Sequence, residues 1–576
     1  MRQIGFAVFC AALMVAPAIS NAQKLPAYSP VTDARLRNPE PGNWLHYRGN
    51  YQGWGYSSLA KINTGNVGKL QLAWSFTTGQ VEGHQAPPFV NNGYMFVTTP
   101  GAQLIALNAA NGAELWRYKK EIPADFLQLH PTNRGVALYG DKVYVATVDA
   151  HLVALDAKSG KVLWTKQVGD SKALQYITLA PLIAKGKVMV GSSGGETGVR
   201  GFVAAFDTET GNEAWRTYTT AAPGEPGGDS WAGDSHKNGG GSIWITGTYD
   251  PETNLSFWGT GNPAPWPTEG RKGDNLYTTS VIALDVDTGK LKGYHQYHHN
   301  DAWDWDEVSA PLLIDTEING KKVKAAVHAG RNGYIWVLER TGDKINFISA
   351  TAYVHNNVFT KVDGKTGRPT YDPARTPGMG KKVTFCPSLW GGKDWPPEAY
   401  NPKTGLFYIP ANDNLCSELP AAEDIKYKKG ELYIGYPIEG VLGSLRFRDG
   451  VPKTIGEIQA WDIKTGKKAW GHKFDRPIWA PLFTTAGNLV FAGGTNDRMF
   501  RAFHAKSGEL LWEQKTNSGI MGMPIAYEVD GTQYIAVQSG WGVDAQRIQD
   551  ALVGKVPGLE NNVPQGGVVW VFAVKK

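Results

Sequence analysis

The stretch Ala154-Leu155-Asp156-Ala157-Lys158-Ser159-Gly160-Lys161-Val162-Leu163-Trp164 decides the fold of this 576-residue chain. Its pattern, Ala-x-Asp-x-x-(Thr/Ser)-Gly-x-x-x-Trp, predicts an apolar strand, a tight turn and a second strand that ends in an indole. Close or looser copies occupy residues 106–116, 205–215, 283–293, 460–470 and 502–512. The copy at 283–293 is degenerate, because Gly293 stands where the tryptophan would fall.

A repeat of this kind is typical of a ring of small sheets. Periods of roughly 40–50 residues with several strands each indicate propeller blades. The tryptophan of each copy is expected to pack between neighbouring blades. The copies, together with less regular sections at 330–345 and 395–410, leave room for about eight blades. The strong strand at 567–572 is expected to pair with 72–76 and close the ring. The sequence therefore predicts an all-β chain with a single eight-bladed β-propeller domain over residues 23–576.

Residues 1–22 have the pattern of a signal peptide. Arg2 precedes an apolar run from Ile4 to Ile19, and small residues up to Ala22 offer a cleavage site. The run is too short for a membrane span, and no other long apolar run follows. Cys10 lacks the neighbours of a lipoprotein site. We expect an exported, periplasmic protein without stable membrane insertion.

The cysteines and the net charge further restrict the cofactors and ligands expected for this chain. Removal of the signal leaves Cys386 and Cys416, which predict a disulfide in an oxidising compartment. No Cys-x-x-Cys-His motif occurs, so the chain carries no covalently attached haem. The formal net charge of +5 is spread without a basic run, which argues against nucleic-acid binding.

The stretch Asn300-Asp301-Ala302-Trp303-Asp304-Trp305-Asp306 is the most informative candidate for function. It holds three carboxylates among tryptophans. In an arbitrary chain such a stretch would be an acidic surface turn. In a ring-shaped scaffold it can direct carboxylates toward a bound metal ion.

Several motifs together give a resemblance to a known family. They are Asn133-Arg134-Gly135, Gly194-Gly195-Glu196-Thr197-Gly198-Val199-Arg200-Gly201, Gly259-Thr260-Gly261-Asn262-Pro263, Trp303-Asp304 and Arg331-Asn332-Gly333. With them the chain resembles the quinoprotein alcohol dehydrogenases from about Asn43 to the C-terminus. These enzymes are propellers that hold pyrroloquinoline quinone (PQQ) and a metal ion on the ring axis.

The resemblance implies a set of cofactor-binding residues. Trp244 matches the indole on which PQQ stacks, and Arg134 and Arg331 match arginines that bind this anionic quinone. The remaining assigned contacts are Gln85, Thr178, Ser193, Gly194, Gly195, Ser242, Asp394 and Trp479. Each alternative is structural: another blade-packing indole, a buried ion pair or an ordinary turn residue.

The resemblance also implies a metal site and a base. Glu196 and Asn262 match metal ligands, and Asp304 matches the catalytic aspartate that is also a ligand. Asp304 would accept the alcohol proton while a hydride passes to PQQ. Asp306, a carboxylate two residues later, resembles the lanthanide-using branch of the family, and calcium stays the alternative.

The chain also departs from the family pattern. Gln128 and Leu129 stand where many relatives carry adjacent cysteines, Gln85 stands where Glu is common, and Asp394 where Asn is common. These changes leave the base and the quinone site intact but weaken the case for a small primary alcohol. We expect a bulky secondary alcohol, a polyol or a sugar as the substrate, with a methanol- or ethanol-type dehydrogenase as the alternative.

The sequence also bears on the partners of the protein and on two alternative classes of protein. Without its own haem the enzyme should pass electrons to a separate soluble cytochrome c, and a homodimer is left open. A cofactor-free propeller scaffold would not need Glu196, Asn262, Asp304 and Arg331. A membrane-anchored, aldose-oxidising quinoprotein would need membrane helices.

Overall fold

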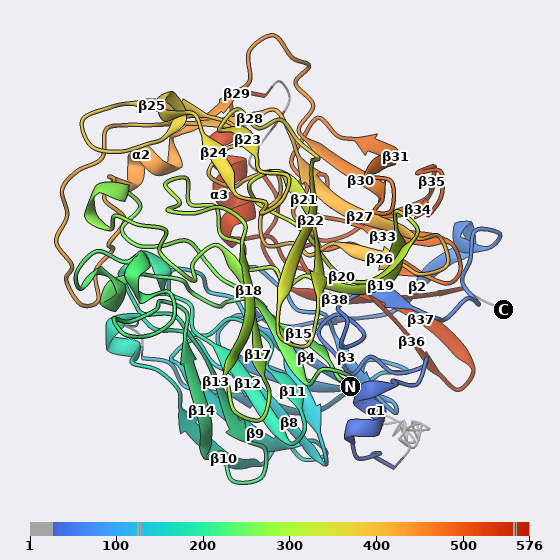
Figure 1. Ribbon diagram of the computed structural model, residues 1–576. Helices are drawn as coiled ribbons and strands as arrows, with labels where there is room; N and C mark the ends of the chain where they lie inside the picture. Colours follow the sequence, from blue (N-terminus) through green and yellow to red (C-terminus); the bar gives the residue numbers. More distant parts are fainter. Residues whose placement is uncertain (1–26, 124–125, 127, 557–558, 560–561, 575–576) are drawn as a thin grey trace, which may run out of the picture.

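The computed structural model describes residues 27–123, 126, 128–556, 559 and 562–574 (Figure 1). The predicted signal peptide, residues 1–22, lies outside the described residues. Strands dominate the described chain, which has short α-helices at α1 (Asp33–Arg37), α2 (Ile438–Leu442) and α3 (Val543–Leu552). None of its helices is long and apolar enough to cross a membrane. The prediction of an all-β chain is confirmed.

Most of the strands form small sheets in chain order. Within the described residues, seven sheets have four strands and one has five. The first two sheets hold β3 (Phe89–Asn91), β4 (Tyr94–Thr99), β5 (Gln103–Asn108) and β6 (Glu114–Lys119), then β7 (Val136–Tyr139), β8 (Lys142–Ala146), β9 (His151–Asp156) and β10 (Val162–Gln167). The next two hold β11 (Leu182–Ala184), β12 (Lys187–Gly191), β13 (Phe202–Asp207) and β14 (Glu213–Tyr218), then β15 (Thr248–Asp250), β16 (Leu255–Gly259), β17 (Ser280–Asp285) and β18 (Leu291–Gln296).

The second half of the chain continues the series. Two sheets hold β19 (Leu312–Ile318), β20 (Lys321–Ala329), β21 (Tyr334–Arg340) and β22 (Ile345–Ala352), then β26 (Ala399–Asn401), β27 (Leu406–Asn412), β30 (Gly456–Asp462) and β31 (Lys467–Lys473). The five-stranded sheet holds β1 (Tyr56–Ser57), β32 (Phe483–Thr485), β33 (Leu489–Ala492), β34 (Met499–His504) and β35 (Leu510–Lys515). The last sheet joins β2 (Leu70–Thr77) to β36 (Ile525–Val529), β37 (Thr532–Ser539) and β38 (Val568–Val574). Apart from the parallel β1–β32 pair, neighbouring strands in these sheets are antiparallel.

The repeat tryptophans connect each sheet to the next, as the sequence predicts. Their indole Nε1 atoms donate to backbone carbonyls of the following sheet or of the turn in it. The pairs are Trp116 with Ala157 (3.1 Å), Trp164 with Thr208 (3.3 Å), Trp215 with Val286 (2.9 Å), Trp470 with Ala505 (3.0 Å) and Trp512 with Leu70 (3.1 Å). Because each indole is also at least partly buried, these contacts stabilise the sheet-to-sheet packing.

The other repeat residues explain the turn itself. The Oδ1 atom of Asp156 accepts hydrogen bonds from the backbone N–H groups of Lys158 and Ser159 and from the Ser159 hydroxyl. This local bonding is why Asp and Ser or Thr recur three positions apart. Gly160 has φ +71°, and a Cβ there would lie 2.5 Å from the Trp116 ring. Glycine is therefore required both by the turn and by the docked indole.

The two ends of the described chain share one sheet. Strand β2 pairs with β38 in antiparallel register, with Trp74 opposite Val571. The expected pairing of 72–76 with 567–572 is confirmed. Trp512 of β35 donates to Leu70 at the start of β2, so the sheet before the closing sheet also contacts the N-terminal strand.

Five further strands of the described chain and the helices α2 and α3 lie outside the sheet series and build up one end of the molecule (Figure 1). They include β23 (Phe359–Val362), β24 (Pro369–Tyr371), β25 (Val383–Phe385), β28 (Leu415–Leu419) and β29 (Leu445–Phe447). Helix α2 contacts α3 at this end. The predicted disulfide between Cys386 and Cys416 is present and joins the end of β25 to β28.

Candidate active site

A cavity of about 310 Å³ brings most of the predicted site residues together. Those that line it are Arg134, Thr178, Ser193, Gly194, Glu196, Trp244, Asp304, Asp306, Arg331 and Asp394. These residues come from segments spread over most of the sheet series. Only the folded chain brings them together around one cavity. Gln85, Gly195, Ser242, Asn262 and Trp479 are buried but are not among the lining residues.

Asp304 sits on a turn that bends its backbone into the left-handed region, with φ +60°. The carboxylate of Asp301 holds this turn, because it accepts the backbone N–H groups of Trp303 at 3.2 Å and Asp304 at 3.0 Å. The neighbouring indoles of Trp303 and Trp305 are fully buried and stacked, with ring centroids 5.2 Å apart. The hydrophobic packing and the polar turn together leave the Asp304 carboxylate facing the cavity.

Asp306 is bound by protein donors on both oxygens. Its Oδ1 accepts the backbone N–H of Asn262 at 2.6 Å. Its Oδ2 accepts the Trp244 indole N–H and Arg331 Nη1, each at 3.2 Å. Asp306 therefore fixes the edge of the Trp244 ring beside the carboxylate group.

The charges in the cavity are unbalanced. Burial raises the pKa of Asp304 well above its usual range, against the opposing effect of Arg331 and with a further increase from Asp306. Burial likewise raises the pKa of Asp306 to about 7. Although burial lowers the pKa of Arg331, the carboxylates of Asp394, Asp304 and Asp306 more than offset that effect and raise it. Carboxylates that gather without enough positive charge favour a bound cation.

Arg134 and Trp244 form a part of the cavity that adjoins Asp306 through the Trp244 indole. The guanidinium of Arg134 lies 4.9 Å from the ring centroids of both Trp244 and Trp395. Its Nη1 donates to the Thr178 hydroxyl at 2.6 Å. A flat aromatic face and a buried cation thus stand side by side, which suits a planar anionic ligand.

Unpartnered polar atoms gather at the same predicted residues. Within the described chain, the buried atoms without a hydrogen-bond partner include Gln85 Oε1 and Nε2, Arg134 Nε, Ser242 Oγ, Asn262 Oδ1, Arg331 Nε and Trp479 Nε1. A buried polar atom left without a partner costs about 1–3 kcal/mol. Other buried atoms of the described chain also lack a partner, but at these residues the free donors and acceptors fit a polar ligand that completes the bonding.

Comparisons with known proteins agree with this geometry. The family model described as PQQ, glucose/ethanol/alcohol dehydrogenase, beta-propeller domain, matches residues 44–367 and 473–535. The chain is 38% identical over 553 residues to quinoprotein alcohol dehydrogenase PedH of Pseudomonas putida, covering 91% of this chain and 90% of the relative. The chain belongs to the PQQ-dependent alcohol dehydrogenase family.

Two further relatives have names that mention a metal. The lanthanide-dependent methanol dehydrogenase of Methylacidiphilum fumariolicum is 36% identical over 578 residues, with 93% of each chain covered. A solved europium-containing methanol dehydrogenase superposes with a TM-score of 0.87 at 34% identity, covering 94% of this chain and 99% of the other. The propeller fold predicted from the repeat is thereby supported at the level of the whole chain.

The residues present fit PQQ, the cofactor of this family. Trp244 offers an aromatic face, Arg134 and Arg331 offer cations with an unpartnered Nε each, and Ser242 and Gln85 offer unpartnered polar atoms. A planar quinone with carboxylate groups would need these donors and this surface. The assignment of individual contacts stays a prediction.

The residues also fit a hard cation by donor type. Glu196, Asp304 and Asp306 line one cavity, and Asn262 Oδ1 is buried nearby without a partner. All four supply oxygen, the donor that calcium and lanthanide ions prefer. In the part of the chain that the structure describes, no three Asp, Glu, His or Cys side chains stand in metal-ligand geometry. Both Asp306 oxygens accept hydrogen bonds from protein donors.

The structure adds cavity residues that the sequence analysis missed. One wall is apolar and is built by Trp266, Leu389, Trp390, Leu432, Ile434, Ile438, Val441 and Leu442. Another is polar and includes His130, Tyr176, Asp544 and Arg547. Arg547 Nη2 donates to the Leu129 carbonyl at 2.7 Å, which ties α3 to the segment before Arg134. Helices α2 and α3 contribute Ile438, Val441, Leu442, Asp544 and Arg547 to these walls, and no sequence motif marked them.

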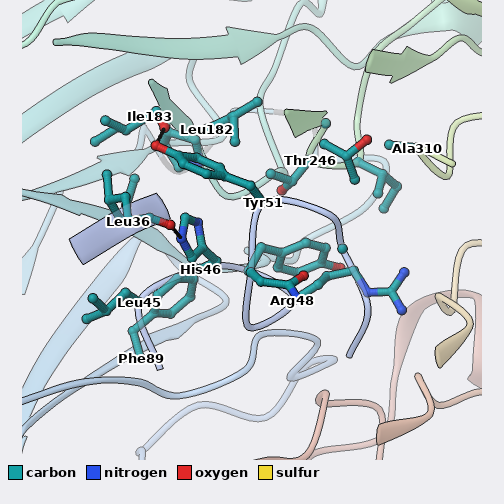
Figure 2. Close-up of a pocket in the computed structure, with 18 of the residues that line it drawn as sticks. Leu36, Leu45, His46, Arg48, Tyr51, Phe89, Leu182, Ile183, Thr246 and Ala310 are labelled. Atoms are coloured by element: carbon teal, nitrogen blue, oxygen red, sulfur yellow. Dashed lines mark hydrogen bonds between the residues drawn. The ribbon is translucent and has the colours of Figure 1, made fainter. Parts of the chain in front are cut away.

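A second cavity of about 30 Å³ is a packing feature of the core (Figure 2). Most of its wall is apolar, and the labelled His46, Tyr51 and Thr246 side chains are hydrogen-bonded, whereas Nε and Nη2 of the labelled Arg48 have no partner among the described residues. His46 Nε2 bonds to the Leu36 carbonyl at 2.7 Å, and the Tyr51 hydroxyl donates to the Ile183 carbonyl at 2.9 Å. A space of this size holds about one or two water molecules. It is too small for a substrate or cofactor.

Proposed function

We propose that this protein is an exported, metal-dependent quinoprotein that oxidises a bulky alcohol, with Asp304 as the base. The observation that carries the proposal is the convergence of Asp304, Arg331 and Trp244 on one cavity. Proton abstraction beside a bound quinone requires three groups: a carboxylate as the base, a permanent cation and an aromatic face for the quinone. The family membership favours this enzyme over a cofactor-free scaffold.

The reaction divides between the bound groups and the side chains. When bound, PQQ supplies a quinone that accepts two electrons as hydride, and the metal ion polarises it as a Lewis acid. The carboxylate of Asp304 accepts the hydroxyl proton of the alcohol as its carbinol C–H bond breaks. Arg331, 3.8 Å from Asp304 Oδ2, keeps that carboxylate oriented and stabilises negative charge in the cavity. The product is the ketone or aldehyde.

The eight larger sheets are proposed to be the eight blades of one ring. Their chain order, the tryptophan contacts between successive sheets and the pairing of β2 with β38 support this arrangement. A closed ring explains why residues as distant as Arg134 and Asp394 line one central cavity.

The metal is proposed to be a lanthanide, bound by Glu196, Asn262, Asp304 and Asp306. Three of the four proposed ligands are carboxylates that line the cavity, and a trivalent ion balances more of their charge than calcium does. Relatives whose names mention lanthanide and europium support the proposal.

The substrate is proposed to carry a large apolar body. The apolar cavity wall contributed by residues 432–442 favours a ring-bearing secondary alcohol over methanol. These residues fall between the two ranges that the family model matches, 44–367 and 473–535. The same wall makes a polyol or sugar, the other bulky substrates expected from the sequence, less favourable, although His130 and Arg547 offer polar contacts.

Export and electron transfer follow from the sequence pattern. The signal-like segment 1–22 supports a periplasmic location, and a separate soluble cytochrome c is proposed as the electron acceptor. Such redox encounters are small and transient, so no stable complex is expected.

Reconstitution of the apoprotein tests the proposal. Purified apoprotein should be inactive and should recover dye-linked oxidation of 1-phenylethanol after addition of PQQ with lanthanum or calcium. NAD or FAD should not replace PQQ. Full activity after exhaustive removal of quinone would sink the proposal.

A further inference from the structure

A buried group of side chains behind the cavity holds the turn that carries Asp304. The Asp301 carboxylate accepts three successive backbone N–H groups, from Trp303, Asp304 and Trp305, at 3.2, 3.0 and 3.4 Å. Arg271 donates to the Asp301 carbonyl and to the Asn300 side chain. Asp301 is 1% exposed and does not line the cavity, so it cannot contact a substrate there.

A second buried carboxylate holds the turn that carries Arg331. Glu307 accepts the backbone N–H groups of Arg331 at 3.2 Å and Asn332 at 3.3 Å. His328 Nε2 lies 2.6 Å from Glu307 Oε2 and fixes that carboxylate from β20. Arg331 therefore leaves β20 with its backbone bound from behind and its guanidinium in the cavity.

His298 connects the two turns. Its Nε2 lies 2.9 Å from Asp301 Oδ1, and its Nδ1 lies 3.3 Å from the side-chain amide nitrogen of Asn332. Nδ1 also lies 3.6 Å from Glu307 Oε1, so the ring lies close to the carboxylates that hold both turns. The ring is fully buried and packs against Trp305 and Phe359.

We propose that His298, with Asp301, is a positioning device that sets Asp304 and Arg331 relative to each other for catalysis. One imidazole bridges the backbone turns of the two residues whose side chains lie 3.8 Å apart in the cavity. Neither His298 nor Asp301 touches the reacting atoms, so their effect passes through the two turns. The inference rests on the proposed role of Asp304 as the base.

The geometry explains why such a device is needed. The backbone of Asp304 adopts φ +60°, a conformation that a non-glycine residue keeps only when its surroundings hold it. A displacement of about 1 Å at a reacting group costs about 10²-fold in rate. A bridge between the turns restricts that displacement for both residues at once.

Two substitutions test the bridge. His298→Phe keeps an aromatic ring against Trp305 and removes both hydrogen bonds. Asp301→Asn keeps an acceptor for the backbone amides but loses the negative charge. It is the second test variant and replaces His298→Phe if that variant does not fold. His295→Phe is the matched control, because His295 is also buried, lies three residues earlier and has an Nε2 without a partner among the described residues.

Two measurements separate positioning from general damage. In the reconstituted enzyme, either test variant should lower kcat by about 10²-fold while KM and PQQ affinity stay at wild-type values. In the apoprotein, hydrogen exchange of the amides at 303–305 and 331–332 should accelerate in the test variants and not in the control. The exchange result needs no cofactor, so it stands even if reconstituted wild type proves inactive and the proposed function fails.

Opposite results would overturn the inference. Folded test variants with wild-type kcat would do so, as would unchanged exchange at both turns. An equal loss of kcat in His295→Phe would also contradict the inference, because the loss would then follow from replacing a buried histidine and not from breaking the bridge.

Discussion

Arg331 Nη2 lies 3.8 Å from Asp304 Oδ2 across the cavity, while its Nη1 lies 3.2 Å from Asp306 Oδ2. With Asp394 Oδ1 at 3.6 Å from Nη1, one guanidinium faces three carboxylates whose pKa values are raised by burial. Arg331 is also anchored from behind by the Leu389 carbonyl, which accepts from Nη2 at 2.9 Å. The roles of Asp304 and Asp306 can therefore be tested by separate substitutions.

Asp304→Asn should abolish the base while it preserves the shape of the site. Turnover of the reconstituted enzyme should fall by roughly 10²–10⁴-fold, because an amide cannot accept the alcohol proton. PQQ binding, followed by quenching of tryptophan fluorescence, should remain. Asp550→Asn, an exposed position on α3, is the matched control and should keep wild-type turnover. Near-normal turnover of Asp304→Asn would assign the base to another group.

Asp306→Ala should separate the metal ions. If Asp306 is a ligand, its loss should weaken activation by lanthanum far more than activation by calcium, because the trivalent ion depends more on the added carboxylate. The measurement is a titration of apoprotein plus PQQ with each ion. Asp306→Asn keeps the side-chain shape but has a single acceptor oxygen, so it can accept from Asn262 or from Trp244 and not from both. It tests the charge with less change of packing than Asp306→Ala does. Parallel responses of wild type and both variants to the two ions would remove Asp306 from the ligand set.

The parts of the molecule that could be predicted from sequence are those with local causes. The Asp156 turn, the Gly160 approach and the Trp164 docking depend on residues within one repeat and its neighbour, so they leave a periodic pattern. The disulfide needed only the count of cysteines and an oxidising compartment. Most of the site residues could be predicted because they lie in motifs that the chain shares with the family it resembles.

The cavity walls had no such pattern. Ile438 lies on α2 and Asp544 and Arg547 lie on α3, about a hundred residues later, and the contact between the two helices brings them to one cavity. Asp301 was visible as part of an acidic stretch, but its burial behind the turn depends on His298 and Arg271. Gln85 and Trp479, assigned to the cofactor by resemblance, do not line the cavity, and their roles stay predictions.

The disulfide should stabilise the segment that carries Trp390 and Asp394. Replacing both Cys386 and Cys416 with serine should lower the free energy of unfolding by about 3–4 kcal/mol, as expected for closing a loop of about 30 residues. Urea unfolding of the apoprotein measures this difference. Wild type treated with a reductant should move toward the variant, whereas the variant should not respond. An unchanged unfolding midpoint would contradict the prediction.

His295 should make the protein less stable in acid. Burial lowers the pKa of His295 to about 4, below the value of about 6.5 in an unfolded chain. As the pH falls below 6.5, the unfolded state binds a proton that the folded state does not, so stability is lost until about pH 4. His295→Phe should reduce the loss of stability between pH 7.5 and pH 5 by about 2 kcal/mol. Identical acid dependence of the two proteins in urea unfolding would refute this.

The apolar wall should set the preference for large substrates. Leu432 and Ile438 line the cavity and are 37% and 41% exposed, so serine at both positions should be tolerated by the fold. The double variant should lose roughly 10-fold in kcat/KM for 1-phenylethanol, because apolar contacts of this size contribute about 1–3 kcal/mol. Its kcat/KM for ethanol should change little, since a two-carbon alcohol does not reach this wall.

A matched variant gives this last prediction its control. Val553 is also 41% exposed, follows α3 and does not line the cavity, so Val553→Ser should leave both substrates unaffected. The wild-type ratio of kcat/KM for 1-phenylethanol over methanol should exceed one. A profile headed by methanol, or equal losses for ethanol and 1-phenylethanol in the double variant, would reject the wall as the specificity element. The assignment to the quinoprotein family would not be affected, because it rests on other residues.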